Sequence, residues 1–588
     1  MKFFSALALV CMSVVFGYAQ TKTFTGPGNF SNAALWNGGT LPVAGNNLRI
    51  NGICTFDNAA ANLAYGTLNV GFASPGTLNW PASGTNTLNV TAVSSSIAGS
   101  AINMTNGGTL RIRTSWSTAN QIFTPGIGTI RWNVTTANSI LPSTIPTYYN
   151  LTTETGVRRV RIGTNTTVVN TLFVSTGIFR IQGNNFTCNG MTSVSGTIDS
   201  NNAGGTETFQ NVVMNAAGVW NSTAAETHTV LGNFTMNGAS ITGTSTGIFN
   251  VTGTFTVGAG TSIMAASTWN VTGATTITGV LNISSATGTK TFGNFTVNGT
   301  FTNTAANESL TITGNLANNG TLNSGSGTYT LSCAARTISG SSAFTIQNLS
   351  LTGTYTNNGN MTVNATFGSA AGTLTQGATG ILGIRVTNPN FTLGTLNASA
   401  AGNTVNYSYA GIQNIRTPND GSYYHLILSG TSTKSLTAAA NISGNLLITA
   451  VTLDVTASNF SINLGGNWTN TGTFTARSGS VALNGSGTQI ITNAAGETFF
   501  NLICTGSGTK QLGGNITVND DITINSVFDA SATGYSIDLK RHWSNNGTFT
   551  AQNGTVILSG SGVNQSIGGS AVTSFNNLTL NNASGATL

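Results

Sequence analysis

Short stretches in which polar and apolar residues alternate recur along the chain. Residues 254–257, 328–331 and 473–476 read TFTV, TYTL and TFTA. Successive side chains of an extended strand point to opposite faces, so this period of two predicts strands with one buried face. Gly, Asn-Gly or Ser-Gly follow every six to ten residues as turn signals, and no helical stripe of useful length is found. The pattern predicts an all-β protein.

Longer phrases recur at a spacing of about 75 residues. Residues 467–476 read NWTNTGTFTA, and residues 542–551 read HWSNNGTFTA. A short apolar run followed by GSG, which starts at Val481, likewise returns at Val556. With Val405 these valines mark three regular copies, and the copies before them are more degenerate. Such self-similarity indicates a repeat architecture.

Two all-β arrangements fit these repeats. Asn-Gly turns can close antiparallel hairpins, but the even spacing and the lack of paired long strands favour coils that wind in one direction. Each strand would then stack on a strand of the next turn about 4.8 Å away, with turns of roughly 20–25 residues. We therefore predict a parallel β-solenoid, similar to a β-helix and built from degenerate repeats of about 75 residues. Aromatic and aliphatic side chains would fill its inside, and Thr, Ser and Asn would line its outside.

The first 19 residues have the pattern of a secretory signal peptide. Lys2 supplies a positive charge, residues 3–16 are apolar, and residues 17–19 read GYA, a small-x-small cleavage site. We expect a mature chain that starts at Gln20 and is secreted, to the outer cell surface or beyond it. No other apolar run approaches the ~18 residues of a transmembrane helix.

Three further segments follow the signal peptide. Residues 20–110 predict an N-terminal cap and the first coils, because the open end of a solenoid exposes strand edges that invite aggregation. Residues 111–404 predict degenerate coils, and residues 405–588 the regular repeats. Leu588 aligns with Leu512, where the preceding copy continues, so we expect the last copy to be truncated and the chain to be part of a longer protein.

Several phrases resemble the long β-strand-repeat surface proteins of Bacteroidetes, and the resemblance covers nearly all of the mature chain. It is carried by LWNGGTLPVAGNNLRI (35–50), NWTNTGTFTA (467–476), FFNLIC (499–504), GGNITV (513–518) and FNNLTL (575–580). The resemblance implies an adhesin-like or structural role at the cell surface. Many such proteins end in a type IX secretion sorting domain, which these 588 residues lack, so export by that system is implied by the resemblance alone.

Charge is scarce and unevenly distributed. Only 5% of the residues are charged, and the net charge is +6. Between positions 111 and 180 lie seven arginines and one acid, Glu154. The alternation places Arg159 and Arg161 on one face and Arg158 on the other, and in aligned turns such residues would stack into a basic stripe for anionic polysaccharide or lipopolysaccharide. The candidate binding residues are Arg111, Arg113, Arg131, Arg158, Arg159, Arg161 and Arg180.

A plainer interpretation of the arginines stays open. Arg159 aligns with Lys434 and Lys510 of later repeats, so part of the stripe would be ordinary solvation by one cation per repeat. Nucleic acid is a conceivable partner for any basic surface, but we do not expect it here. The expected partners are a host or neighbouring cell surface, or an extracellular polysaccharide.

The sequence offers little for catalysis. Polysaccharide lyases and hydrolases on β-helices need paired carboxylates, or a carboxylate and a base, on neighbouring turns. The 13 acids are mostly isolated, and the one adjacent pair, Asp520-Asp521, is interpreted as a solvated turn rather than a cation site. The histidines, His228, His425 and His542, are expected at the surface with no acid near enough for a metal cluster. We predict no catalytic residue, metal or cofactor.

The cysteines of the mature chain are separated by well over a hundred residues, which would place them many turns apart. We interpret them as small buried apolar residues without disulfide partners. They are Cys54, Cys188, Cys333 and Cys504.

These observations predict a non-catalytic extracellular or cell-surface protein with a structural or adhesin-like role. The alternative is a β-helix module that binds or degrades polysaccharide. A remote alternative is ice binding, because Thr-x-Thr phrases repeated in each turn would form a flat array of hydroxyl groups.

Overall fold

The computed structural model describes residues 19–57, 63–82, 84–134, 138–200, 204–243 and 247–587. Residues 1–18 of the predicted signal peptide lie outside the described residues. The chain is a parallel β-solenoid of about 25 turns, which confirms the predicted all-β class. Two short 3-10 helices, η1 (Ala33–Leu35) and η2 (Asn388–Asn390), are the helices of the described residues. The chain divides into an N-terminal unit, Met1–Thr252, and a C-terminal unit, Gly253–Leu588.

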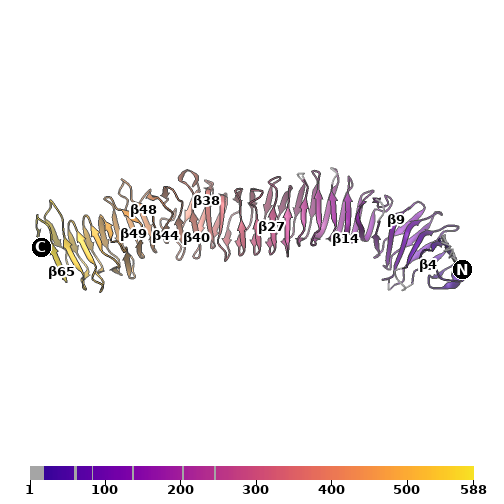
Figure 1. The fold of residues 1–588 in the computed structure, drawn as a ribbon, viewed down its shortest axis with the longest axis horizontal. Helices are drawn as coiled ribbons and strands as arrows, with labels where there is room; N and C mark the ends of the chain where they lie inside the picture. The colour runs from indigo at the N-terminus through magenta and orange to yellow at the C-terminus, as the bar shows by residue number, and fades with distance from the viewer. Residues whose placement is uncertain are drawn as a thin grey trace, which may run out of the picture. The chain divides into compact units, whose positions relative to one another are not determined.

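The N-terminal unit begins with two parallel sheets (Figure 1). One contains β1 (Thr21–Phe24), β3 (Asn47–Ile50), β5 (Ala64–Val70), β7 (Thr87–Ser94), β9 (Thr109–Trp116) and β11 (Thr129–Trp132). The other contains β2 (Gly28–Asn29), β4 (Ile53–Thr55), β6 (Thr77–Asn79), β8 (Ser100–Asn103) and β10 (Gln121–Thr124). The strands of the segment 20–110 therefore pair in register with those that follow them. In the first turn of this segment, the buried ring of Trp36 makes edge-to-face contacts with the buried rings of Phe24 and Phe30.

Later turns of this unit stack one interior side chain directly over the next. Phe179 of β14 (Thr166–Ile181) pairs with Ile198 of β16 (Thr197–Ser200), and Ile198 pairs with Trp220 of β18 (Val219–Ser222). All three side chains are fully buried, and Phe179 alternates along β14 with half-buried neighbours. Each such column removes large apolar surfaces from water at about 25 cal/mol per Å². In these columns the predicted division between an apolar inside and a polar outside is confirmed.

The strands of the last turns of the C-terminal unit belong to three parallel sheets, each of which forms one face. The first face includes β42 (Thr404–Tyr407), β44 (His425–Leu428), β47 (Leu446–Ile448), β50 (Trp468–Asn470) and β53 (Gln489–Thr492). The second includes β49 (Ile462–Leu464), β52 (Ser480–Leu483) and β55 (Asn501–Cys504), and the third includes β60 (Ser536–Leu539), β63 (Thr555–Leu558) and β65 (Asn577–Leu580).

The long period of the sequence does not coincide with the turn of the solenoid. Val405 pairs with Leu426 of the next turn. Leu426 pairs with Leu446 and Leu446 with Trp468, so Trp468 lies three turns after Val405 on the same face. Val481, which occupies the position of Val405 in the next sequence repeat, lies further along the chain and in a different sheet. Val556, the next equivalent, lies in the third sheet. Each sequence repeat thus advances by three turns and part of a fourth, so equivalent residues rotate from face to face.

Asparagine side chains continue the hydrogen-bond ladder at the corners, where the backbone turns away from strand pairing. The Asn445 Oδ1 accepts from the Asn467 backbone N–H at 2.9 Å, and the Asn467 Oδ1 accepts from the Ile490 N–H at 2.9 Å, one turn later each time. Buried or half-buried backbone donors need such partners. This requirement explains why a solenoid of tight corners is rich in Asn.

Candidate functional site

The seven predicted arginines lie on four strands of the N-terminal unit. Arg111 and Arg113 lie on β9, Arg131 on β11, Arg158, Arg159 and Arg161 on β13 (Thr147–Arg161), and Arg180 on β14. Strand pairing brings them together in two separate columns, Arg111 with Arg131 and Arg161 with Arg180. The single stripe that we expected is therefore two groups, and each contains an acidic residue.

The first group is centred on Glu154, which lies on β13. The Arg111 Nη2 lies 3.2 Å from one carboxylate oxygen of Glu154, and the Arg131 guanidinium donates to the other. Arg113 shares the outer face of β9 with Arg111, and it donates to the Tyr65 carbonyl at 3.2 Å and to the Thr91 hydroxyl at 2.9 Å. The guanidinium groups of Arg111, Arg113 and Arg131 therefore link neighbouring turns of the solenoid.

The second group is centred on Asp199 of β16, whose side chain is 5% exposed. The Arg180 Nε donates to the Asp199 Oδ2 at 2.8 Å, and the Arg159 Nε lies 3.8 Å from the same oxygen. Asn221 donates to the other carboxylate oxygen at 3.2 Å. Asp199 lies outside the stretch 111–180 and meets the arginines only through the pairing of β14 with β16, so the sequence alone carries no signal for this contact.

Arg158 and Arg161 are the exposed members of the set. Val160 is buried between Arg159 and Arg161, so these two share the outer face as predicted. The prediction that Arg158 lies on the opposite face is wrong. The pairing of β13 with β14 shifts register between Glu154 and Arg159, and this irregularity leaves Arg158 exposed instead of directed into the core.

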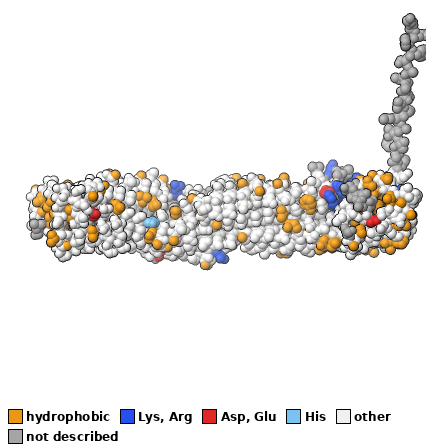
Figure 2. Space-filling view, turned by 90° about the horizontal axis from the view of Figure 1, so that it is seen from below, with side chains coloured by type: hydrophobic (Ala, Val, Ile, Leu, Met, Phe, Trp, Pro, Cys, Tyr) orange, Lys and Arg blue, Asp and Glu red, His pale blue; other side chains and the backbone are white. Residues whose placement is uncertain are grey.

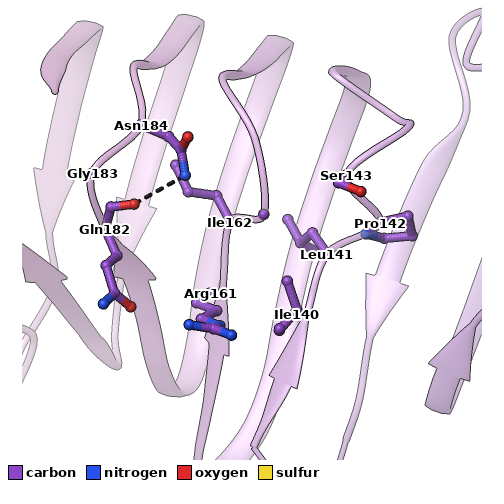
Figure 3. A pocket seen from close by; sticks show the side chains of 10 residues that line it. Ile140, Leu141, Pro142, Ser143, Arg161, Ile162, Gln182, Gly183 and Asn184 are labelled. Carbon is purple, nitrogen blue, oxygen red and sulfur yellow. Dashed lines mark hydrogen bonds between the residues drawn. The ribbon is translucent and has the colours of Figure 1, made fainter.

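Arg161 lies in an open groove of about 690 Å³ on the outside of the N-terminal unit (Figure 3). Three successive turns line the groove with residues 140–143, 161–163 and 182–184. Ile140 is 46% exposed and is the register partner of Arg161. Among the described residues, no hydrogen bond or ion pair engages the Arg161 side chain. The groove therefore presents one available guanidinium beside aliphatic and amide side chains.

Gly163 keeps this groove open. A Cβ at this position would lie 2.8 Å from the Leu141 carbonyl oxygen and 2.9 Å from a methyl group of Ile140. Any larger residue would push the two turns apart or fill the space beside Arg161.

Two of the three histidines behave as predicted, and the third does not. His425 and His542 are half-exposed and replace Asn in the corner ladder, where their Nδ1 atoms accept from the backbone N–H of Asn445 at 2.9 Å and of Ser566 at 3.1 Å. His228 is fully buried. The prediction of a surface position with no acid nearby is wrong for His228, because its partners come from other turns of the solenoid.

His228 belongs to a buried polar cluster in the N-terminal unit. Its Nδ1 lies 2.7 Å from the Glu207 Oε2, and its Nε2 lies 3.1 Å from the Ser222 Oγ. The Ser200 hydroxyl donates to the same Glu207 oxygen at 3.0 Å. Glu226 is also buried, and one of its carboxylate oxygens forms a group of potential metal-ligand atoms with Glu207 and His228, all within 4.8 Å of one another.

Ser222, His228 and Glu207 have the connectivity of a nucleophile, base and orienting acid. Ser222 and His228 are 0% exposed, and a nucleophile must reach a substrate to act on it. The cluster therefore belongs to the interior of the solenoid and supplies no surface-accessible hydrolytic site.

Two lysines that the sequence aligns with Arg159, namely Lys434 and Lys510, are buried rather than solvated. Lys434 and Lys510 are 0% exposed. The Lys510 ammonium donates to the Gly485 and Gly508 carbonyls at 2.8 and 3.1 Å, and Lys434 donates to the Tyr409 and Gly411 carbonyls. The interpretation of one solvated cation per repeat is wrong for these two lysines, because they satisfy corner carbonyls inside the solenoid.

Asp520 and Asp521 lie at a corner and have separate partners. Arg541 donates to Asp520 at 2.8 Å, and the His542 backbone N–H donates to Asp521 at 3.1 Å. The two carboxylates therefore stabilise the next turn.

All four described cysteines are free thiols. Cys54, Cys188 and Cys504 are buried as predicted, whereas Cys333 is only half-buried. Burial raises the pKa of the Cys504 thiol to about 12.

No protein-family model, curated protein or solved structure matches this chain. No helix among the described residues is long and apolar enough to cross a membrane. Figure 2 shows a face on which charged side chains are few and uncharged polar groups and backbone predominate.

Proposed function

We propose that this protein is a non-catalytic, secreted surface protein with a structural or adhesin-like role. We further propose that its N-terminal unit binds anionic polysaccharide along the groove beside Arg161. The observation that carries the proposal is the exposed Arg161 side chain, which has no partner among the described residues and lies in a groove built from three turns. A guanidinium matches a carboxylate or sulfate group with two parallel hydrogen bonds.

The surroundings of Arg161 support a polymeric ligand. Arg161 is the register partner of Arg180, and Arg159 lies two residues before it on the same face. Arg159 and Arg180 share one carboxylate, Asp199, so with Arg161 the local charge is positive. Gln182 and Asn184 add amide groups at the far side of the groove for hydroxyl groups of a sugar. Repeated anionic sugars could contact several turns at once.

The remaining sequence predictions fit this proposal. The signal peptide 1–19 would direct export, with the type IX system as the proposed route. Segment 20–110 would cap the solenoid end, and the long sequence repeats would lengthen the shaft. A cell-surface polysaccharide of a host or neighbouring cell would be the partner.

Affinity electrophoresis of residues 20–588 in gels that contain a carboxylated, a sulfated or a neutral polysaccharide tests the proposal. We expect retardation by the anionic polymers that weakens with salt, and several-fold less retardation for Arg161→Gln. Arg477→Gln is the matched control, because Arg477 is similarly exposed and lies in the C-terminal unit. Equal retardation by neutral polymer, or no effect of Arg161→Gln, would contradict the groove. Shortened polymers after incubation would contradict the non-catalytic role.

A column of hydroxyl groups supports ice binding as a second candidate. Thr291, Thr311, Thr330 and Ser350 are successive register partners on the outside of the C-terminal unit. They lie one turn apart, at about 4.8 Å. Inhibition of ice recrystallisation by residues 20–588, and its loss in Thr311→Tyr, would support this function. Growth of ice grains at the rate of a control protein would exclude it.

A further inference from the structure

The buried cluster of the N-terminal unit contains two carboxylates, and no lysine or arginine nearby in the sequence can balance their charge. Glu207 and Glu226 are 2% and 4% exposed, and His228 is fully buried. If both carboxylates are ionised, one imidazolium leaves a net negative charge inside the solenoid. A buried, uncompensated charge costs several kcal/mol.

No lysine or arginine occurs between positions 181 and 289. The turns directly before and after the cluster fall inside this range, because Glu207 pairs with Phe186 of the preceding turn and His228 pairs with Phe249 of the following turn. A cationic side chain from the adjoining turns therefore cannot balance the two carboxylates. The missing charge must come from a proton or from a bound cation.

Two buried carboxylates of the C-terminal unit have different surroundings, one with a cation and one with neutral donors. In the C-terminal unit, Glu308 lies 3.8 Å from the ammonium group of the buried Lys290. Glu497 is a single carboxylate that accepts from the Trp468 indole at 2.7 Å and from the Asn470 amide at 2.8 Å. Among the described residues, Glu207, Glu226 and His228 form the one group of three potential metal ligands.

We propose that Glu207, Glu226 and His228 supply three ligands of a buried site for one divalent transition-metal ion, with Zn²⁺ as the preferred ion. Two carboxylates and one neutral imidazole balance a charge of +2. Zn²⁺ binds imidazole nitrogen and carboxylate oxygen at about 2.0–2.2 Å, so its ligand atoms lie roughly 3.4 Å apart. The ligand atoms here already lie within 4.8 Å of one another, and small side-chain rotations would close the site.

The surroundings of the imidazole support this role. Glu207 on β17 (Thr206–Met214) is the register partner of His228 on β19 (Thr227–Val230), so strand pairing brings the two ligands together. Ser222 engages the Nε2 at 3.1 Å and fixes the ring orientation, as outer-shell partners of metal-bound histidines do. The Trp220 and Phe249 rings pack against it at 5.3 and 4.4 Å between centroids. The ion would replace the proton between the His228 Nδ1 and the Glu207 Oε2, now 2.7 Å apart.

The burial of all three ligands makes the site structural. An ion there could not exchange quickly with solvent, and we expect it to be incorporated as the turns stack, so that metal binding stabilises the fold.

Metal analysis of residues 20–588 by inductively coupled plasma mass spectrometry tests the site. The chain is unfolded in guanidinium with EDTA, freed of chelator, and refolded with Zn²⁺ or Co²⁺ before desalting. We expect about one ion per chain, a visible absorption band in the Co²⁺ form and a higher melting temperature with metal than without. Less than about 0.1 ion per chain, with the same melting temperature in both cases, would show that the carboxylates share a proton and would overturn the proposal.

Two variants locate the ion. Glu226→Gln keeps the volume and the Glu207–His228 contact but removes one charge, and we expect it to lose most of the bound metal. Glu308→Gln is the matched control, because it removes another buried carboxylate and should retain one ion per chain. Equal metal content in both variants would place the ion elsewhere and contradict this site. If Glu226→Gln does not fold, the wild-type metal content and the Co²⁺ spectrum decide by themselves.

Discussion

Gln489 and Lys510 are register partners on neighbouring turns of the C-terminal unit, and both side chains are buried. The Gln489 amide donates to the Leu464 and Gly466 carbonyls at 2.8 and 2.6 Å, and its oxygen accepts from the Gly485 N–H at 2.7 Å. The same two residue types pair one sequence repeat earlier, as Gln413 with Lys434. Long polar side chains inside the solenoid thus satisfy corner groups that strand pairing leaves unbonded.

Replacing Gln489 by Leu should destabilise these corners strongly. The change leaves two carbonyls and one N–H without their partner, at a cost of about 3 kcal/mol. Hydrogen exchange followed by mass spectrometry should show faster exchange around residues 464–485. Gln511→Leu is the control, because Gln511 lies on the neighbouring turn of the same sheet and its side chain donates one hydrogen bond, to Asp529. Similar exchange in both variants would contradict the role of Gln489.

The buried Lys434 should make the protein more stable as the pH rises above 8. Desolvation lowers the pKa of Lys434 from 10.5 to about 8 in the folded protein. Between pH 8 and 10.5 the unfolded chain binds more protons at this residue than the folded chain, so stability increases with pH in that window. Between pH 7.5 and 9.5, the contribution of Lys434 to the free energy of unfolding should increase by about 2 kcal/mol, measured by urea unfolding as the difference between the wild type and Lys434→Met.

The comparison with Lys434→Met isolates this contribution, because Lys290 and Lys510, whose pKa values desolvation also lowers, are the same in both proteins. Measurements should stop below pH 10, because burial raises the pKa of Tyr407 to about 12. A tyrosine whose pKa is raised in the folded protein makes folding less favourable once the pH exceeds about 10, the pKa of tyrosine in the unfolded chain. An unchanged pH dependence in Lys434→Met would show that Lys434 does not cause it.

Thiol reactivity should separate Cys333 from the other cysteines. Cys54, Cys188 and Cys504 are buried, and desolvation raises the pKa of Cys54 and Cys504. The thiolate is the reactive form, so a thiol-specific chromogenic reagent at pH 8 should label Cys333 first. The other three should react only on unfolding. Cys333→Ser should abolish the early phase, and an early phase that persists in this variant would contradict the burial of the others.

Removing the carboxylate of Asp199 should strengthen polysaccharide binding if the second arginine group contributes to it. Asp199 holds Arg159 and Arg180, and Asp199→Asn leaves both guanidinium groups available beside Arg161. We expect a several-fold gain in retention by anionic polymer at low salt. The measurement is the same affinity electrophoresis, with circular dichroism to confirm folding.

Asp454→Asn is the control for this gain. Asp454 similarly holds Arg477, at 2.6 Å, but in the C-terminal unit. A gain of equal size in both variants would reflect net charge alone, and no gain in Asp199→Asn would exclude the second arginine group from binding.

The sequence allowed part of the candidate site to be predicted. The density of arginines between 111 and 180 identified the basic surface, and alternation placed Arg159 and Arg161 on one face. It could not show that Glu154 and Asp199 engage most of these arginines, because the acids meet them across turns. A signal for the buried cluster was present, since Glu207 and His228 each lie two residues before an inward-facing Phe209 or Val230.

By itself, the sequence determined the strands, the corners and the inward face of the regular repeats, because a period of two and frequent turn residues admit few other structures. Phe249 and Trp269, which begin the matching sequences FNVT and WNVT, are both fully buried. The tertiary structure decided which residues of different turns meet. The length of a turn depends on how its corners close, so the sequence repeat carries Val405, Val481 and Val556 to three different faces. The same closure brings Glu207 into contact with His228 of the next turn.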